Sequence, residues 1–169
     1  MTNEIKYQRD AMVQEAIAND PRIEKAKKFI MKLCIVFLAA RLIFLIVETA
    51  FVLSRGLPVS SCVLNYVLLA VGLLFALGLY KQGTKALAYL AIAGGVLTIV
   101  NLLKGNFISN LQIGDVFYNI YAITLVVAML IQIASMLLML LNDSCKKYFS
   151  EMERINKTIM EQNNRGIIK

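Results

Sequence analysis

Four long apolar runs leave this chain few possible folds. They cover residues 33–53, 62–80, 86–103 and 118–141, and each is about 18 to 24 residues long with few charges. A helix needs about 20 residues to cross a hydrocarbon core of about 30 Å, so each run is long enough to span a bilayer. The runs are rich in Leu and Ala and lack alternation of polar and apolar residues, which argues against strands. The sequence therefore predicts an all-α membrane protein, a four-transmembrane-helix bundle.

The residues between the runs are typical of helix ends. Gly56 and Pro58 follow the first run, and residues 81–85 form a short polar turn after the second. The stretch 104–117 is the one sizeable loop that we expect. Apolar residues make up 59% of the chain and charged residues 17%, which is more apolar surface than a water-soluble domain buries.

Three segments follow from this pattern. We expect a cytoplasmic N-terminal helical segment over residues 1–32, a four-helix transmembrane domain over 33–141 and a cytoplasmic C-terminal helix over 142–169. In the first segment, Asp20 is placed to cap a helix and Pro21 to begin it. We expect that helix to continue through the membrane to about residue 53.

Lysine and arginine are distributed unequally over the two sides of the predicted bundle. Fifteen of the 18 basic residues lie before the first run, in the 81–85 turn or after the last run, against Arg55 and Lys104 on the other side. The positive-inside rule places the richer side in the cytoplasm. We therefore expect an integral membrane protein with both termini cytoplasmic, as in a bacterial cytoplasmic membrane. Orientation explains the net charge of +7 better than a nucleic-acid site does.

Both end segments show apolar residues on one side of a helix. The C-terminal stripe repeats at steps of three or four and is accompanied by charged residues off it; its members are Cys145, Tyr148, Met152, Ile155 and Ile159. This pattern predicts amphipathic terminal helices. One interpretation is that they lie on the inner headgroups or pack against each other. The other is self-association or docking on a cytoplasmic partner.

Five polar residues inside the predicted spans are candidates for a functional site: Arg41, Glu48, Asn65, Asn101 and Gln132. A charge at the middle of a bilayer costs about 2.5–3.5 kcal/mol on insertion scales, so each charged residue there needs a reason. At about 1.5 Å per residue from the inner boundary, Arg41 and Gln132 lie about 12 to 14 Å deep, and the other three lie about 22 Å deep. The four helices thus contribute to two polar layers.

Small residues share helix faces with these polar residues. Asn65 lies on one stripe with Gly72, and Asn101 lies on one with Gly94. In lipid, small residues let helices approach closely, and polar side chains hydrogen-bond across the contact. The faces that carry the polar residues are therefore suited to helix packing.

Three interpretations of the polar layers remain open. In the structural one, Arg41 bonds to Gln132 or to Glu48, and Glu48 bonds to Asn65 or to Asn101. In the second, Glu48 binds a cation or proton from the outer side, with Arg41 as its counter-charge. In the third, the stripe that carries Arg41 and Glu48 completes its hydrogen bonding on another chain.

Residues that usually carry catalysis or bind metals are scarce. The chain has no histidine, and its three cysteines, Cys34, Cys62 and Cys145, lie on different segments. We therefore expect no enzyme, metal or cofactor. The expected function is a non-catalytic component of a membrane assembly, with the lipid bilayer and another membrane subunit or further copies of the chain as partners. The alternative is a small oligomeric channel or transporter for a cation or proton that uses Glu48 and Arg41.

Overall fold

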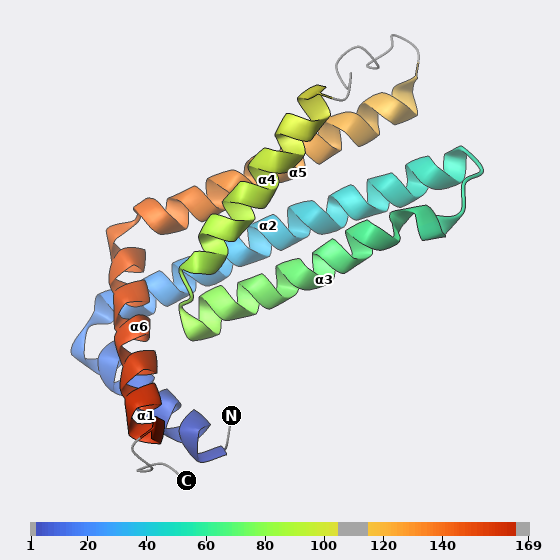
Figure 1. The fold of residues 1–169 in the computed structure, drawn as a ribbon. Helices are drawn as coiled ribbons and strands as arrows, with labels where there is room; N and C mark the ends of the chain where they lie inside the picture. The colour runs from blue at the N-terminus through green and yellow to red at the C-terminus, as the bar shows by residue number, and fades with distance from the viewer. Residues whose placement is uncertain (1–2, 105–114, 165–169) are drawn as a thin grey trace.

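The computed structural model describes residues 3–104 and 115–164, which form helices and turns with no strand among them. In chain order (Figure 1) the elements are α1 Asn3–Asn19, α2 Pro21–Ser54, the 3-10 turn η1 Val59–Cys62, α3 Val63–Leu77, the π turn η2 Gly78–Gln82, α4 Ala86–Lys104, α5 Val116–Leu141 and α6 Asp143–Asn164. Four helices are long and apolar enough to cross a membrane: α2, α3 with its flanking turns, α4 and α5. The predicted all-helical fold with four helices of spanning length is confirmed. Most of the predicted loop 104–117 lies outside the described residues.

The start of α2 follows the predicted capping pattern. Asp20 is extended and its Oδ1 accepts a hydrogen bond from the backbone N–H of Arg22 at 2.9 Å, while Pro21 occupies the first helical position. The cap satisfies a backbone donor that the helix itself leaves unpaired, and the fixed φ of proline suits that position. The helix then continues without a break for 34 residues. The first predicted span and the residues before it from Pro21 onward are therefore one continuous helix.

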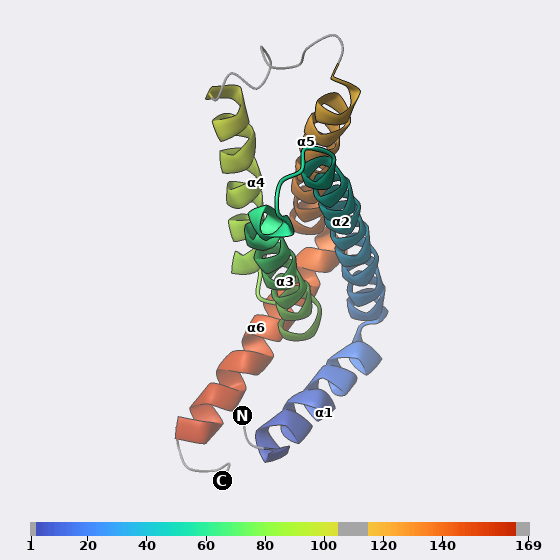
Figure 2. The same ribbon diagram turned by 90° about the vertical axis from the view of Figure 1, so that its right-hand side faces the viewer.

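Two of the four long helices form the centre of the bundle. α2 and α5 pack along one another, α4 packs on α5, and α3 packs on α2. The short turn after η2 joins α3 to α4, and the two helices then diverge (Figures 1 and 2). At Gly95 a side chain on α4 would bring its Cβ to 2.9 Å from Cγ1 of Ile133, so glycine permits the close approach of α4 to α5.

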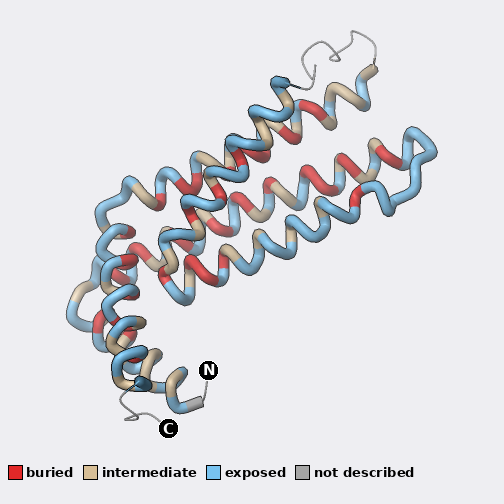
Figure 3. Tube along the Cα trace, viewed as in Figure 1, coloured by how far each residue is buried: buried red, intermediate tan, exposed pale blue. Residues whose placement is uncertain are grey.

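Burial is unequal among the helices, as Figure 3 shows. α2 and α5 carry most of the buried residues of the long helices, whereas Ala76 is the one buried residue of α3. The larger apolar cluster lies at the end of the bundle where α1 and α6 pack, and a smaller one lies between α2 and α5 around Phe44 and Met129. α3 and α4 therefore present most of their surface to the surroundings.

α1 and α6 pack against the end of the bundle that holds the α3–α4 turn, and both ends of the described chain lie there (Figures 1 and 2). The last carbonyls of a helix lack partners within the helix. Here Tyr148 Oη donates to the carbonyl of Tyr80 at 2.6 Å, and Asn156 Nδ2 donates to that of Gln82 at 3.1 Å. Arg9 donates to the carbonyl of Lys81. The two end helices thus cap the turn.

The apolar stripe of α6 is covered by the chain itself. All five residues of the predicted stripe are buried, as is Phe149. They pack against α2, α5, α1 and the turn, where Gly83 adopts a φ of 62° and leaves space for Met152. The sequence left open that the two end helices pack against each other; in the structure α6 packs on α1 and also on α2 and α5.

Candidate functional site

The polar layer nearer to α1 and α6, called the inner layer, consists of Arg41 and Gln132 and joins α2 to α5. Arg41 Nε donates to Gln132 Oε1 at 2.9 Å, which is one of the two pairings that the sequence left open for Arg41. Gln132 is buried on α5, while Arg41 is half-buried on α2. A neutral amide oxygen is the acceptor here, so the pairing satisfies a donor of the guanidinium without neutralising its charge.

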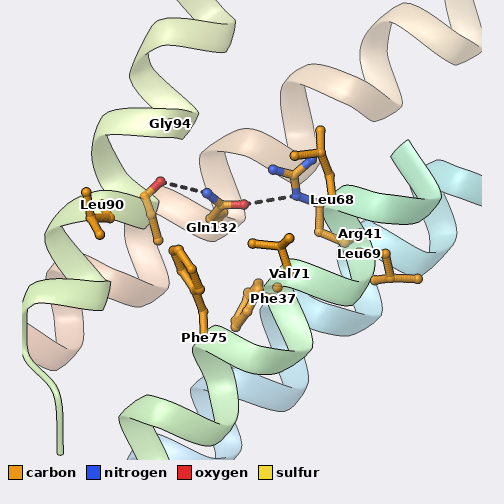
Figure 4. Close-up of a pocket in the computed structure, with 11 residues that line it drawn as sticks. Phe37, Arg41, Leu68, Leu69, Val71, Phe75, Leu90, Gly94 and Gln132 are labelled. Carbon is orange, nitrogen blue, oxygen red and sulfur yellow. Dashed lines mark hydrogen bonds between the residues drawn. The ribbon is translucent and has the colours of Figure 1, made fainter. Parts of the chain in front are cut away.

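The same glutamine also reaches α4. Gln132 Nε2 donates to the backbone carbonyl of Ala91 at 2.7 Å, so the amide bridges two helices (Figure 4). The carbonyl that accepts this bond belongs to a different helix. Gln132 can approach it because Ala91 and Gly95 are small residues. Both ends of the Gln132 amide are occupied, which fixes the acceptor oxygen toward Arg41.

A cavity of about 210 Å³ lies beside this layer, between the four long helices. Its walls are almost entirely apolar, and Figure 4 shows Phe37, Phe75 and Val71 beneath the pair of polar residues. Arg41 and Gln132 supply its polar side chains. Leu68 of α3 and Leu90 of α4 line it and are exposed, so the cavity lies at the surface of the bundle where these two helices diverge.

The other polar layer, called the outer layer, consists of Glu48 and Asn65 and joins α2 to α3. Asn65 Nδ2 donates to Glu48 Oε1 at 2.6 Å, one of the two pairings expected for Glu48. Glu48 is 7% exposed, and its second oxygen, Oε2, is buried without a hydrogen-bond partner among the described residues. Arg41 and Glu48 make no salt bridge with each other. The structure thus assigns the two charged residues of α2 to separate layers.

Asn101 belongs to neither layer. It lies on α4 with an exposed side chain and makes no hydrogen bond within the part of the chain that the structure describes. Of the five candidate residues, the structure brings together Arg41 with Gln132 and Glu48 with Asn65, and it leaves Asn101 apart.

Some contributors to these layers were not predicted from the sequence. The Ala91 carbonyl and the aromatic walls formed by Phe37 and Phe75 carry no polar signal in the sequence. Beside the outer layer, Thr49 Oγ1 donates to the carbonyl of Leu45 at 2.8 Å and lies 3.2 Å from Tyr66 Oη. A threonine one position after Glu48 was the available signal for this contact.

Among the described residues, no group of three or more Cys, Asp or Glu side chains is placed to hold a metal ion. The three cysteines are free and buried. At the end of the bundle outside the spans, burial raises the pKa of the Cys145 thiol to about 11, which keeps it protonated at neutral pH. Comparison with protein-family models, curated proteins and solved structures gives no match for this chain.

Proposed function

We propose that this chain is an integral membrane protein in which α2 to α5 cross the bilayer with both termini in the cytoplasm, and that it serves as a non-catalytic component of a membrane assembly. The four apolar helices and the unequal distribution of basic residues support the insertion and the orientation. An even number of spans agrees with the two termini lying at the same end of the bundle.

The observation that carries the assembly role is the uncovered face of α4. Gly94 and Asn101 lie seven residues apart on this face and both are exposed. A Cβ added at Gly94 would meet nothing within 4 Å. In lipid, a small residue lets a second helix approach closely, and an amide on the same face can form a hydrogen bond with that helix.

The occupant that we propose for this face is a transmembrane helix of another subunit with a polar side chain opposite Asn101. Lipid tails offer an amide no hydrogen-bond partner, so an Asn101 side chain in the hydrocarbon region gains from a polar group on a neighbouring helix. Thr98, one turn earlier on α4, requires no partner on another helix. Its Oγ1 already donates to the carbonyl of Gly94 at 2.9 Å.

The test is the native mass of the affinity-tagged full chain extracted from its own membrane in a mild non-ionic detergent. We expect a second protein at fixed stoichiometry. Asn101→Leu should release that protein, while the matched control Thr98→Val, which removes a polar group already satisfied within α4, should retain it. A homo-oligomer without a second protein, or a complex that survives Asn101→Leu unchanged, would contradict this assignment.

The orphaned oxygen of Glu48 favours a second candidate, a small oligomeric channel or transporter for protons or cations. The Glu48 carboxyl group is 7% exposed, and one of its oxygens has no hydrogen-bond partner among the described residues. That oxygen is available to bind a proton or a cation. Arg41 supports this role less directly, because it bonds to Gln132 in the other layer.

Flux measurements on purified protein in sealed vesicles test the transport candidate. Proton or potassium flux should require the wild-type chain and be lost in Glu48→Gln. Thr49→Val, at the adjacent position, is the control and should retain the flux. Absence of flux in a defined homo-oligomer of the wild-type chain would eliminate this candidate.

A further inference from the structure

The charge of Arg41 has no counter-charge in the described chain. Its Nε donates to a neutral amide oxygen, and it takes part in none of the salt bridges. Glu48, seven residues further along α2 and therefore about 10 Å away along the axis, bonds to Asn65 instead. Arginine stays protonated in proteins and carries five N–H donors. Most donors of this guanidinium are thus available to another acceptor.

The cavity beside Arg41 limits what that acceptor is attached to. Its volume is about 210 Å³, and an apolar cavity of about 150 Å³ holds a benzene molecule, so the space fits a slender apolar group. A helix with its side chains is about 10–12 Å wide and does not fit there. The exposed Leu68 and Leu90 lie at the cavity edge, so a longer chain has a path out between α3 and α4.

We propose that this cavity binds an anionic amphiphile, a single hydrocarbon chain that ends in a carboxylate or a phosphate group. The oxyanion accepts hydrogen bonds from the Arg41 guanidinium, whose planar fork matches the geometry of both groups. Gln132 holds the guanidinium in place from the other side, because its own amide is fixed by the Ala91 carbonyl. The hydrocarbon chain lies against Phe37 and Phe75 and leaves the bundle between the diverging helices.

This binding site goes beyond the assembly role and is tested on the purified full chain without a partner. Thermal unfolding is followed by circular dichroism in a non-ionic detergent, with sodium dodecanoate or dodecyl phosphate as the probe and dodecanol or inorganic phosphate as the comparison. We expect each anionic amphiphile to raise the unfolding midpoint in a saturable way and native mass spectrometry to show one bound molecule. The probe with the lower Kd identifies the preferred oxyanion.

Three variants separate the site from general effects of charge. Arg41→Gln should weaken binding about ten- to a hundredfold, because a hydrogen bond to a charged group is lost. Lys104→Gln removes one positive charge outside the cavity and should leave the Kd unchanged. Gly94→Leu places bulk at the cavity edge, where a Cβ meets nothing, and should abolish binding while Arg41 and the fold are intact.

Four results would overturn the proposal. One is an equal shift with dodecanol, which would mean that the anion is not recognised. Another is the same shift with inorganic phosphate alone, which would assign the site to a free ion. The third is unchanged binding in both Arg41→Gln and Gly94→Leu. The last is no binding by either amphiphile to the wild-type chain, which would leave an acidic side chain of a partner helix as the counter-charge of Arg41.

Discussion

The two polar layers are built from the same chemistry but have different surroundings. Each pairs a charged residue of α2 with an amide on a neighbouring helix, Arg41 with Gln132 and Glu48 with Asn65. Glu48 is enclosed, whereas Arg41 is half-buried beside a cavity that reaches the surface between α3 and α4. The pair of a charged residue and an amide is thus enclosed in the outer layer, where the helices stay in contact. In the inner layer the same kind of pair is accessible, because α3 and α4 diverge there.

The largest expected effect on stability distinguishes the face of α4 that packs on α5 from its uncovered face. A Cβ at Gly95 would approach Ile133 Cγ1 to 2.9 Å, whereas one at Gly94 would meet nothing within 4 Å. Gly95→Leu should lower the free energy of unfolding by about 3 kcal/mol through overpacking. Gly94→Leu gains the same helix propensity and should stay within about 0.5 kcal/mol of the wild type.

Thermal unfolding in non-ionic detergent measures both glycine variants. Because the two substitutions are identical and adjacent, their difference reports packing alone. Equal losses of stability at the two positions would mean that α4 is covered on both faces, and the inner layer would then be as closed as the outer one.

A double-mutant cycle tests the pairing of Glu48 with Asn65 in the outer layer. Asn65→Leu should cost about 1–2 kcal/mol, because Glu48 loses its hydrogen-bond donor while it stays buried. Glu48→Leu combined with Asn65→Leu should recover most of this loss, since two apolar groups of similar size then replace the polar pair. Strictly additive losses would show that the two side chains do not depend on each other.

A smaller effect is expected when the carboxyl group of Glu48 becomes an amide. Glu48→Gln keeps an oxygen that accepts from Asn65 Nδ2 and keeps the volume of the side chain. The unfolding free energy should change by less than about 1 kcal/mol. A loss larger than that of Asn65→Leu would indicate that Oε2 has a partner that only a carboxyl group serves.

The smallest effect is expected at the edge of the outer layer. The Thr49 hydroxyl donates to the carbonyl of Leu45 in its own helix, so its hydrogen bond does not hold two helices together. Thr49→Val should shift the unfolding free energy by no more than about 0.5 kcal/mol in the same thermal measurement. A loss as large as that of Asn65→Leu would mean that the contact with Tyr66 also holds α2 and α3 together.

The sequence predicted the helices well, because their length and composition can be counted along a single segment. The cap at Asp20 and Pro21 and the continuous α2 follow from local chemistry in the same way. Counting along the helices also gave Arg41 and Gln132 a similar predicted depth, and of the two pairings expected for Arg41 the structure contains the one with Gln132.

The sequence could not decide which face of α4 is packed. Gly94 and Gly95 are adjacent small residues, and either suits a close contact between helices. In the structure Gly95 faces α5, and this turns Asn101, which shares the Gly94 face, outward. Asn101, which the sequence predicted at the depth of Glu48 and Asn65, therefore makes no hydrogen bond with either residue. The cavity was not predictable either, because it arises where α3 and α4 diverge and belongs to no single helix.

Spin-label accessibility along α4 in phosphatidylcholine nanodiscs tests most directly whether this helix crosses the bilayer with one face uncovered. Labels are introduced one at a time into the purified chain after its three cysteines are replaced. Labels at Gly94 and Leu97 should collide readily with oxygen and little with a water-soluble nickel complex, while labels at Ala88 and Ala91 should be protected from both. Nickel access at all four positions, or equal protection of Gly94 and Ala91, would contradict this arrangement.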